Sequence, residues 1–304
     1  MKKVISVKNL VKKYSKLNAV NDISFDVFKG EIFGLLGENG AGKTTTLEMI
    51  EGLRKPTSGK IEVLGCDTSK NLVDVKERIG VQLQSSAYYN FLTLKEILEL
   101  FSKFYKNNLD PDELLEMVDL KEKANSFVGS LSGGQKQRFS IVASLVNDPE
   151  VVFLDEPTTG LDPLARRNLW NLISKIKSQG KTIILTTHYM EEAEVLCGRI
   201  AIMESGKILA MDDTHKLIDK AEFPYTLSFV QENIAQATIK KLEKLGKVEN
   251  LFGKNNHFIV RMRDKKSSED AIKIVEVLNP ETSTYGRATL EDLFIELTGK
   301  NIEE

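Results

Sequence analysis

The opening part of the chain is a series of short apolar runs that alternate with turn residues. Their length and their content of β-branched residues predict strands. The runs lie at residues 5–7, 23–27, 31–37 and 60–65. We therefore expect the chain to begin with a subdomain built mainly of β-structure.

After residue 90 the apolar positions follow a helical period. Thr93 and Glu96 have the spacing of a capping box ahead of the pattern LKEILELFSKFY, which marks a helix start. Asp110 followed by Pro111 marks another, because aspartate caps helices and proline suits their first turn. The sequence thus predicts a helical subdomain at about residues 86–150.

From residue 151 onwards, strand patterns and helix patterns alternate. The apolar runs VVFL, TIIL and RIAIM are separated by amphipathic patterns at residues 163–177 and 189–197. Such alternation predicts a parallel sheet that is covered by helices, which is the α/β class.

A change of pattern near Glu222–Pro224 marks the expected boundary between two domains, residues 1–222 and 223–304. The predicted order beyond it is strand, helix, strand, strand, helix, strand, with GKNN at 253–256 as a hairpin turn. A last capped helix ends at Gly299. This order resembles a ferredoxin-like unit, so the tail is expected to be a small α+β domain.

The composition indicates which partners and which cellular compartment to expect. Its 304 residues carry 42 Lys and Arg against 44 Asp and Glu, and this near-neutral balance argues against nucleic acid as a partner. Cys66 and Cys197 are the two cysteines, too few for a disulfide framework, which indicates a reducing compartment. The sequence begins without the apolar segment of a signal peptide, and no apolar run approaches the ~20 residues of a membrane span. A chain that is soluble by itself is expected.

A glycine-rich stretch follows the strand expected at 31–37. GENGAGKT at 37–44 fits the pattern G-x-x-x-x-G-K-[ST], with a strand before it and a helical pattern after it, as a phosphate-binding loop requires. The lysine can reach the β- and γ-phosphates, and the threonine hydroxyl can bind Mg²⁺. The nucleotide-binding residues expected here are Gly37, Asn39, Gly40, Gly42, Lys43, Thr44 and Thr45.

The stretch VVFLDEP at 151–157 supplies a second part of the same site. Its apolar residues predict a buried strand that delivers Asp155 and Glu156 at its carboxyl end, where ligands bind in open α/β sheets. Asp155 suits Mg²⁺, and Glu156 can polarise an attacking water. These features alone do not distinguish a kinase, a GTPase, a helicase and a transporter motor.

The stretch SLSGGQKQR at 130–138 distinguishes them. Its serine and paired glycines precede a helical pattern, so backbone N–H groups at the helix start would form an anion site. LSGGQ at 131–135 resembles the signature motif of the ATP-binding cassette (ABC) ATPases, and the other motifs of that family follow the same order. These are Tyr14 for adenine, Gln84 of the Q-loop, the acidic pair, GLD at 160–162 as the D-loop, and His188 as the switch histidine.

The resemblance covers about residues 3–215 and implies the fold of a P-loop NTPase. This fold has a RecA-like core, an N-terminal β-subdomain and a helical subdomain that carries the signature. The resemblance also implies ATP and Mg²⁺ as cofactors. The residues implied in hydrolysis are Glu156, His188 and Gln84, and those implied near the metal are Thr44, Gln84 and Asp155.

In this family the signature does not serve the nucleotide of its own chain. Two cassettes pack head to tail, and the signature of one faces the γ-phosphate bound by the other. The signature residues implied here are Ser132, Gly133, Gly134 and Gln135, and Asp162 of the D-loop lies at the contact.

Some of these residues also have simpler interpretations. Tyr14 could be a core residue, and Gln82 rather than Gln84 could face the site. Asp162 precedes a proline and a helical pattern, so it is also a good helix N-cap.

The family implies partners in the membrane. In its transporters a short helix of the membrane subunit docks beside the Q-loop, where this chain has Tyr88, Tyr89 and Phe91. These aromatic side chains either form that docking surface or pack inside the helical subdomain.

The closing segment ATLEDLFIELTGK resembles the C-terminal extension of bacterial drug-resistance-type ABC exporter ATPases. This resemblance favours the motor subunit of an exporter of drugs, peptides or lipids, working with separate membrane-spanning subunits as a homodimer or heterodimer of ATPase chains. Such a protein is expected in the cytoplasm, peripheral on the inner face of the cell membrane. The alternatives are the ATPase of an importer and a soluble ABC ATPase with a role outside transport.

Overall fold

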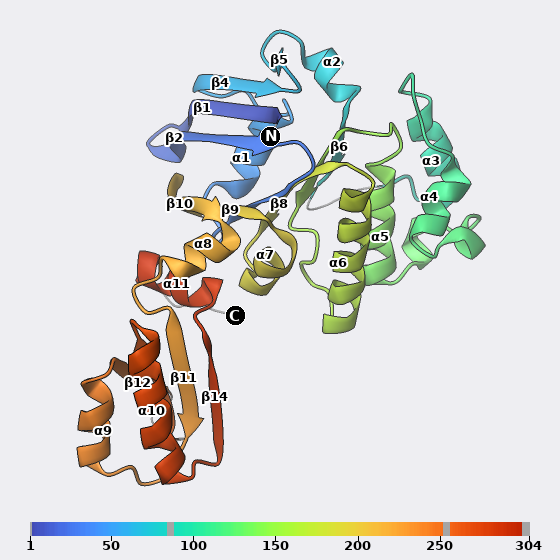
Figure 1. Ribbon diagram of the computed structural model, residues 1–304. Coiled ribbons are helices and arrows are strands. Elements are labelled where there is room, and N and C mark those ends of the chain that lie inside the picture. Colours follow the sequence, from blue (N-terminus) through green and yellow to red (C-terminus); the bar gives the residue numbers. More distant parts are fainter. Residues whose placement is uncertain (1, 84–87, 252–255, 300–304) are drawn as a thin grey trace. The chain divides into compact units, whose positions relative to one another are not determined.

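The computed structural model describes residues 2–83, 88–251 and 256–299 (Figure 1). The chain forms two compact units, Met1–Asp212 and Asp213–Glu304. The boundary expected from the sequence, at residue 222, lies after helix α8 (Thr214–Asp219), whereas the units separate before it. The reason is that α8 packs against α11 (Leu290–Thr298), the last helix of the second unit.

The first unit begins with an antiparallel sheet in the order β2-β1-β4-β5, the β-subdomain expected from the apolar runs. Its first two strands extend well beyond those runs, because polar residues on the exposed face continue the ladder. A bulge between Val7 and Leu10 interrupts the alternation of buried and exposed positions. The strand bounds are β1 Lys3–Tyr14, β2 Leu17–Phe28, β4 Ser58–Val63 and β5 Cys66–Asp67.

The central sheet of this unit has the strand order β10-β9-β3-β8-β7-β6. From β9 to β6 each neighbouring pair is parallel, as the alternation of strands and helices predicted. β3, β7 and β8 are buried along their whole length, which is typical of parallel strands covered on both faces. The bounds are β3 Ile32–Leu36, β6 Ile79–Gln82, β7 Val151–Asp155, β8 Thr182–Thr187, β9 Arg199–Glu204 and β10 Lys207–Asp213.

Helices connect the strands of the central sheet. α1 starts directly after the glycine-rich loop and packs on β7 and β8, while α6 and α7 pack against each other. The bounds are α1 Lys43–Ile50, α2 Leu72–Lys76, α6 Pro163–Ser178 and α7 Met190–Leu196. One core of buried apolar side chains joins α1 to both sheets.

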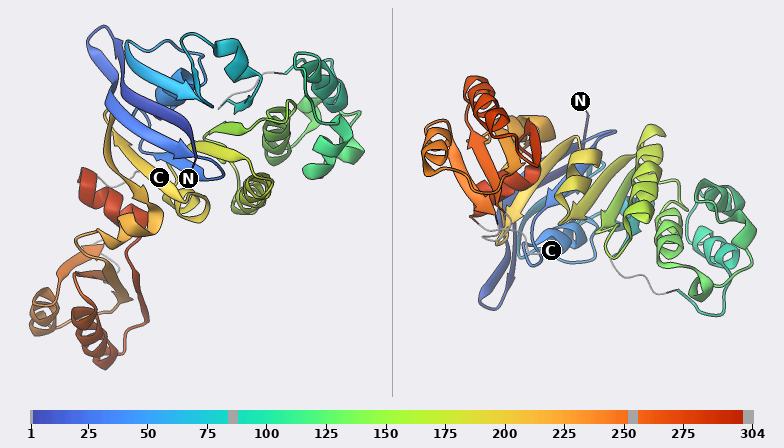
Figure 2. Two further views of the ribbon diagram at one scale, coloured as in Figure 1. Left: turned by 45° about the horizontal axis from the view of Figure 1, so that its top comes forward. Right: turned by 90° about the horizontal axis from the view of Figure 1, so that it is seen from below.

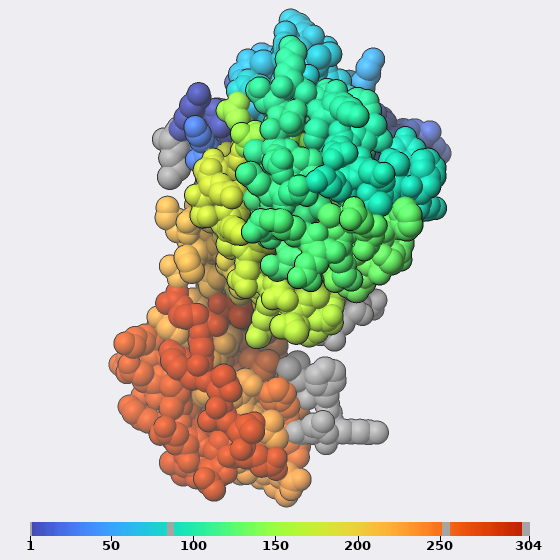
Figure 3. Space-filling view, turned by 90° about the vertical axis from the view of Figure 1, so that its right-hand side faces the viewer, coloured from blue at the N-terminus to red at the C-terminus, as the bar shows by residue number. Residues whose placement is uncertain are grey.

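A helical group lies beside strand β6 and away from β1 and β2, as the views in Figures 1 and 2 show. Thr93 and Glu96 form the expected capping box, and Asp110 caps the next helix. Figure 3 shows the outer surface of this group, in teal and green. Its elements are α3 Leu94–Ser102, α4 Pro111–Met117, α5 Gly133–Ala143 and the 3₁₀ turns Lys121–Lys123 and Val128–Ser130.

The second unit holds an antiparallel sheet in the order β12-β13-β11-β14. With α9 after the first strand and α10 after the third, this is the ferredoxin-like arrangement expected from the sequence. The turn expected at 253–256 lies mostly outside the described residues. The bounds are β11 Tyr225–Val230, α9 Gln236–Glu243, β12 Lys247–Leu251, β13 His257–Met262, α10 Lys265–Leu278 and β14 Thr282–Arg287.

In the part of the chain that the structure describes, every helix is too short or too polar to cross a membrane.

Candidate nucleotide site

Three neighbouring strands bring the predicted site residues together. β8 lies between β3 and β7 in a parallel register, in which Leu36 pairs with Thr187 and Thr186 pairs with Asp155. The carboxyl ends of these strands therefore meet at one edge of the sheet. There the glycine-rich loop follows β3, the acidic pair ends β7, and His188 follows β8. This edge is where open α/β sheets bind their ligands.

The glycine-rich loop depends on residues without a Cβ atom. Gly42, the N-cap of α1, has a φ angle of 101°, and a Cβ there would lie 2.4 Å from the carbonyl oxygen of Ala19. At Gly37 a Cβ would lie 2.3 Å from the carbonyl oxygen of Met203. Glycine is therefore required at both positions for the loop to turn between β3 and α1.

Lys43 is the first residue of α1, and its side chain folds back over the loop. Its ammonium donates to the carbonyl oxygens of Gly37 at 2.8 Å and Glu38 at 3.1 Å. It also lies 3.3 Å from Oε1 of Glu156. Burial lowers the pKa of Lys43 and the nearby acids oppose this effect. The geometry thus holds a buried positive charge over the loop.

Asp155 and Thr44 form an oxygen-lined pair at the end of β7. The Thr44 hydroxyl donates to Oδ1 of Asp155 at 3.2 Å, and the Thr186 hydroxyl donates to the same oxygen. Burial raises the pKa of Asp155, and these two hydrogen bonds oppose the rise. Hard oxygen donors of this kind suit Mg²⁺, which takes few protein ligands and keeps water and phosphate oxygens as the others.

Glu156 is held in an unusual backbone conformation. Its φ angle is +46°, which is uncommon for a residue other than glycine. Its N–H donates to the hydroxyl of Thr186 at 3.0 Å, and its Oε2 accepts from the Thr159 hydroxyl at 3.2 Å. Nδ1 of His188 lies 3.3 Å from the same Oε2. The close approach of His188, together with the charge of Lys43, lowers the pKa of Glu156 to about 2.

A pocket of about 680 Å³ opens over this loop. Tyr14 stands at its wall, 39% exposed, with the charged groups of Lys12 and Arg54 over its ring at 5.1 and 5.6 Å. An exposed ring that lines the pocket favours the stacking interpretation over the core interpretation. The lining residues are Tyr14, Leu17, Asn18, Ala19, Asn39, Gly40, Gly42, Lys43, Thr44, Thr45, Glu156 and Ser205.

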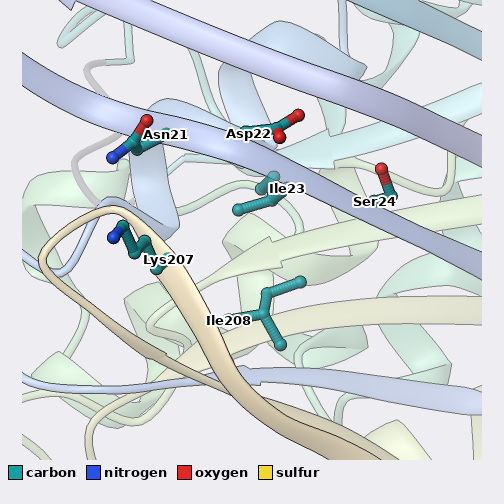
Figure 4. A pocket seen from close by; sticks show the side chains of 6 residues that line it. All are labelled: Asn21, Asp22, Ile23, Ser24, Lys207 and Ile208. Carbon is teal, nitrogen blue, oxygen red and sulfur yellow. The ribbon is translucent and has the colours of Figure 1, made fainter.

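A turn between β9 and β10 supports the loop from the side. The N–H of Gly206 donates to the carbonyl of Ala41, and its carbonyl accepts from the N–H of Asn21. Beside this turn a second, shallower hollow of about 580 Å³ separates β2 from β10, with Asn21 and Lys207 at its rim (Figure 4). Its described lining includes none of the predicted site residues.

The signature residues lie at the start of α5, in the helical group. Ser132 is the N-cap, and it forms a capping box with Gln135, whose Oε1 accepts from the N–H of Ser132 at 3.0 Å. Lys123 donates to the same oxygen at 3.3 Å. Ser132 and Gly133 are exposed. Among the described residues, none of the signature positions lines the nucleotide pocket.

The remaining predicted residues lie in different parts of the first unit, and one of them lies outside the described residues. Asp162 is the N-cap of α6 and accepts from the N–H of Ala165 at 2.9 Å. Gln84 lies outside the described residues, while Gln82 is buried at the end of β6. Tyr88 packs against Phe101 and Phe139, with ring centroids 6.3 and 5.2 Å away.

Several residues that contact the site belong to none of the motifs in the sequence. The Thr186 hydroxyl donates to Asp155 and accepts from the N–H of Glu156. The Thr159 hydroxyl donates to Glu156. Asn18 and Ser205 line the pocket. The only sequence signal for Thr186 is a pair of threonines at the carboxyl end of an apolar strand. Asn18 and Ser205 come from strand and turn positions that no motif marks.

Comparisons with known proteins agree with this arrangement. A family model described as ABC transporter matches residues 20–159. The Nod factor export ATP-binding protein I of Ralstonia nicotianae (strain ATCC BAA-1114 / GMI1000) is 34% identical and aligns with 99% of this chain and 95% of its own length. The protein of that name from Burkholderia orbicola (strain AU 1054) is 43% identical over 71% of this chain and 72% of its own length.

Solved structures match about 70% of the chain. A structure of the ATP-binding subunit of an ABC transporter has 31% identity and a TM-score of 0.64, covering 70% of this chain and 91% of that chain. A dimeric ATP-binding cassette in a post-hydrolysis state, bound to ADP and Pi, has 27% identity and a TM-score of 0.63, covering 69% of this chain and 98% of that one. The chain therefore belongs to the ABC transporter family and is an ABC-type ATPase with the P-loop NTPase fold.

Proposed function

We propose that this chain is the ATP-hydrolysing motor subunit of an ABC exporter whose membrane-spanning subunits are separate polypeptides. The observation that carries the proposal is the convergence of Lys43, the Thr44–Asp155 pair and the Glu156–His188 pair at one edge of the central sheet. A buried cation, an oxygen pair and a carboxylate beside an imidazole are the groups that phosphoryl transfer to water requires.

Each residue has a role in this scheme. Lys43 binds the β- and γ-phosphates, and backbone N–H groups from Gly37 to Gly42 surround them. Thr45 lies at the α-phosphate, and Tyr14 stacks on the adenine. Glu156 accepts a proton from the attacking water, and its low pKa keeps it ionised at neutral pH. His188 orients Glu156 and the γ-phosphate.

Mg²⁺ fits the oxygen pair of Thr44 and Asp155, with Gln84 as the further ligand that the family resemblance implies. The metal would neutralise charge on the phosphate oxygens. Thr186 orients Asp155 through its hydroxyl hydrogen bond.

The signature completes the site of a second cassette. Ser132, Gly133 and Gly134 form a helix start whose first two residues are exposed, and none of the three lines the described part of the chain's own pocket. A helix N-terminus favours an anion, so this one would face the γ-phosphate held by a partner cassette. Gln135 acts through the capping box rather than by direct contact, and Asp162 lies at the interface. The dimeric cassette among the similar solved structures supports this head-to-tail assembly.

Export and a membrane partner are supported by two observations. The two relatives described above are named as export ATP-binding proteins. In addition, Tyr89 and Phe91 are 55% and 74% exposed in the helical group, where we propose that a membrane subunit docks. The chain would then work on the inner face of the cell membrane.

ATP hydrolysis by the purified chain, and copurification with a multi-span membrane protein encoded beside it, test the proposal. We expect Mg²⁺-dependent hydrolysis that Lys43→Ala abolishes. Tyr89→Ser with Phe91→Ser should weaken copurification without reducing hydrolysis. Hydrolysis that survives Lys43→Ala would refute the site, and copurification that survives the double serine variant would refute the docking surface.

A further inference from the structure

Glu192 is a carboxylate that the reaction scheme above does not use. It lies on α7, four residues after His188, and its side chain is 0% exposed. Burial raises its pKa. Burying a carboxylate is costly, and an uncharged side chain of similar volume would fill this space without that cost. Its contacts therefore indicate what the charge does.

The first contact joins two helices. Nε1 of Trp170, on α6, donates to Oε1 of Glu192 at 3.2 Å. Both side chains are buried. A hydrogen bond between buried side chains, one of them acidic, is stronger than an exposed one. It fixes α7, which follows His188, to α6, which follows Asp162.

The other contacts reach the segments that carry the reacting groups. The hydroxyls of Thr187 and Thr158, together with Trp170, offset the effect of burial on the pKa of Glu192. Thr187 immediately precedes His188, and its carbonyl accepts from the N–H of Gly37. Thr158 follows Glu156 by two residues. Among the described residues, neither Oε2 of Glu192 nor the Thr158 hydroxyl has a hydrogen-bond partner.

A second contact joins α6 to Tyr189, the N-cap residue of α7. The guanidinium of Arg166, on α6, lies 4.4 Å from the ring centroid of Tyr189. The Tyr189 ring in turn lies 4.2 Å from the imidazole of His188. Two separate contacts therefore connect α6 with the segment that begins at His188 and continues into α7.

We propose that Glu192 is a positioning residue for ATP hydrolysis. It fixes α7, and with it the segment that carries His188, to α6 through the Trp170 hydrogen bond, so that α6 sets the position of His188 relative to Glu156. The proposal rests on the function given above, because it concerns the same hydrolysis site.

The experiment compares Glu192→Gln, Trp170→Phe and the double variant, all in the full-length chain. Three quantities are measured: kcat for ATP, Kd for ATP, and the thermal unfolding temperature. We expect each single variant to lower kcat by about tenfold, equal to about 1.4 kcal/mol in activation free energy. Kd should stay unchanged, because the phosphate-binding loop is untouched. The double variant should lose no more than a single one, because both act on the same contact: glutamine removes the charge of the acceptor, and phenylalanine removes the donor.

Glu191→Gln is the matched control, since Glu191 is the exposed neighbour on the same helix. It should leave all three quantities unchanged. A purely structural role for Glu192 would instead lower the unfolding temperature and leave kcat per folded molecule unaltered, which would overturn the proposal. Losses in kcat that multiply in the double variant would overturn it too. If Glu192→Gln does not fold, Trp170→Phe decides by the same criteria.

The two proposals fail in different ways. A wild-type chain without ATPase activity overturns the proposed function and this inference together. An active wild type whose kcat is unaffected in Glu192→Gln and Trp170→Phe overturns the inference alone.

Discussion

The ammonium of Lys43 lies 3.3 Å from Oε1 of Glu156, and the two side chains are only 3% and 6% exposed. This ion pair connects the residue proposed to bind the γ-phosphate with the residue proposed to activate water. A γ-phosphate and Glu156 therefore compete for one cation. The same contact that keeps Glu156 ionised thus opposes the binding of ATP.

Glu156→Gln should separate ATP binding from hydrolysis. The amide keeps the shape of the side chain but cannot accept the proton, and it removes the charge that competes for Lys43. Loss of a general base costs about 10²–10⁴ in rate, so hydrolysis should nearly stop while ATP binds more tightly. Size-exclusion chromatography should then show an ATP-bound dimer. Hydrolysis at the wild-type rate would show that Glu156 is not the base.

Ser132→Arg, added to Glu156→Gln, should abolish that dimer. The exposed N-cap of α5 has room for a larger side chain in the monomer, but an arginine would occupy the space that the partner's phosphate needs. Binding of ATP by the monomer should persist, because Ser132 does not line the chain's own pocket. Ser178→Arg is the control, an exposed serine at the end of α6, and it should leave the dimer intact. A dimer that survives Ser132→Arg would contradict the head-to-tail assembly.

Tyr14→Ala should weaken ATP binding by roughly 1–3 kcal/mol, the value of one stacked base. The ring lines the pocket, and Lys12 and Arg54 lie over it without covering it completely, since 39% of the residue is exposed. Tyr14→Phe should bind ATP almost as well as the wild type. Isothermal titration measures both variants, and equal affinity of Ala and wild type would exclude stacking.

The sequence predicted the elements that motifs or periodicity mark. Lys43, Asp155 and Glu156 follow apolar strands, so their meeting at one edge follows from a parallel sheet. The capping boxes at Thr93 and Ser132 were equally readable from spacing, although only the former was predicted. The C-terminal order of elements was sufficient to identify the ferredoxin-like unit, because strands and helices there differ clearly in period.

Contacts between distant segments could not be predicted in this way. Thr186 and Trp170 are ordinary residues of a strand and a helix, and their roles arise only when the sheet register and helix packing bring Asp155 and Glu192 beside them. Tyr88 was one of three adjacent aromatic residues without a distinguishing signal. The structure places it inside the helical group and leaves its neighbour Tyr89 exposed.

A chain that ends at Asp213, the last residue of β10, should still bind Mg-ATP. All residues that line the nucleotide pocket belong to the first compact unit. This truncation also removes α8, which would otherwise lose its packing against α11. Fluorescence titration with an ATP analogue tests binding, and circular dichroism tests folding. A folded truncation that fails to bind nucleotide would show that the second unit contributes to the site.

The stability of the chain should fall as the pH rises through about 8, because of Glu51. This residue follows α1, is 2% exposed and has an Oε1 without a hydrogen-bond partner. Burial, together with the charges of Asp155 and Glu48, raises its pKa to about 8. An acid whose pKa is higher in the folded than in the unfolded state takes up a proton on folding. Its contribution to stability is therefore complete below the unfolded pKa of about 4.3 and disappears as the pH passes the folded value.

Glu51→Gln should remove this pH dependence, since the amide has nearly the same shape and never ionises. Urea unfolding at several values between pH 5 and 9 measures the effect. The free energy of unfolding should decline less steeply with pH in the variant than in the wild type, and at pH 9 the variant should be the more stable protein. Glu99→Gln is the control, because it removes the same charge from an exposed position on α3 and should leave the slope unchanged. Parallel curves for Glu51→Gln and wild type would mean that Glu51 ionises normally, and that its surroundings relax to solvate the charge.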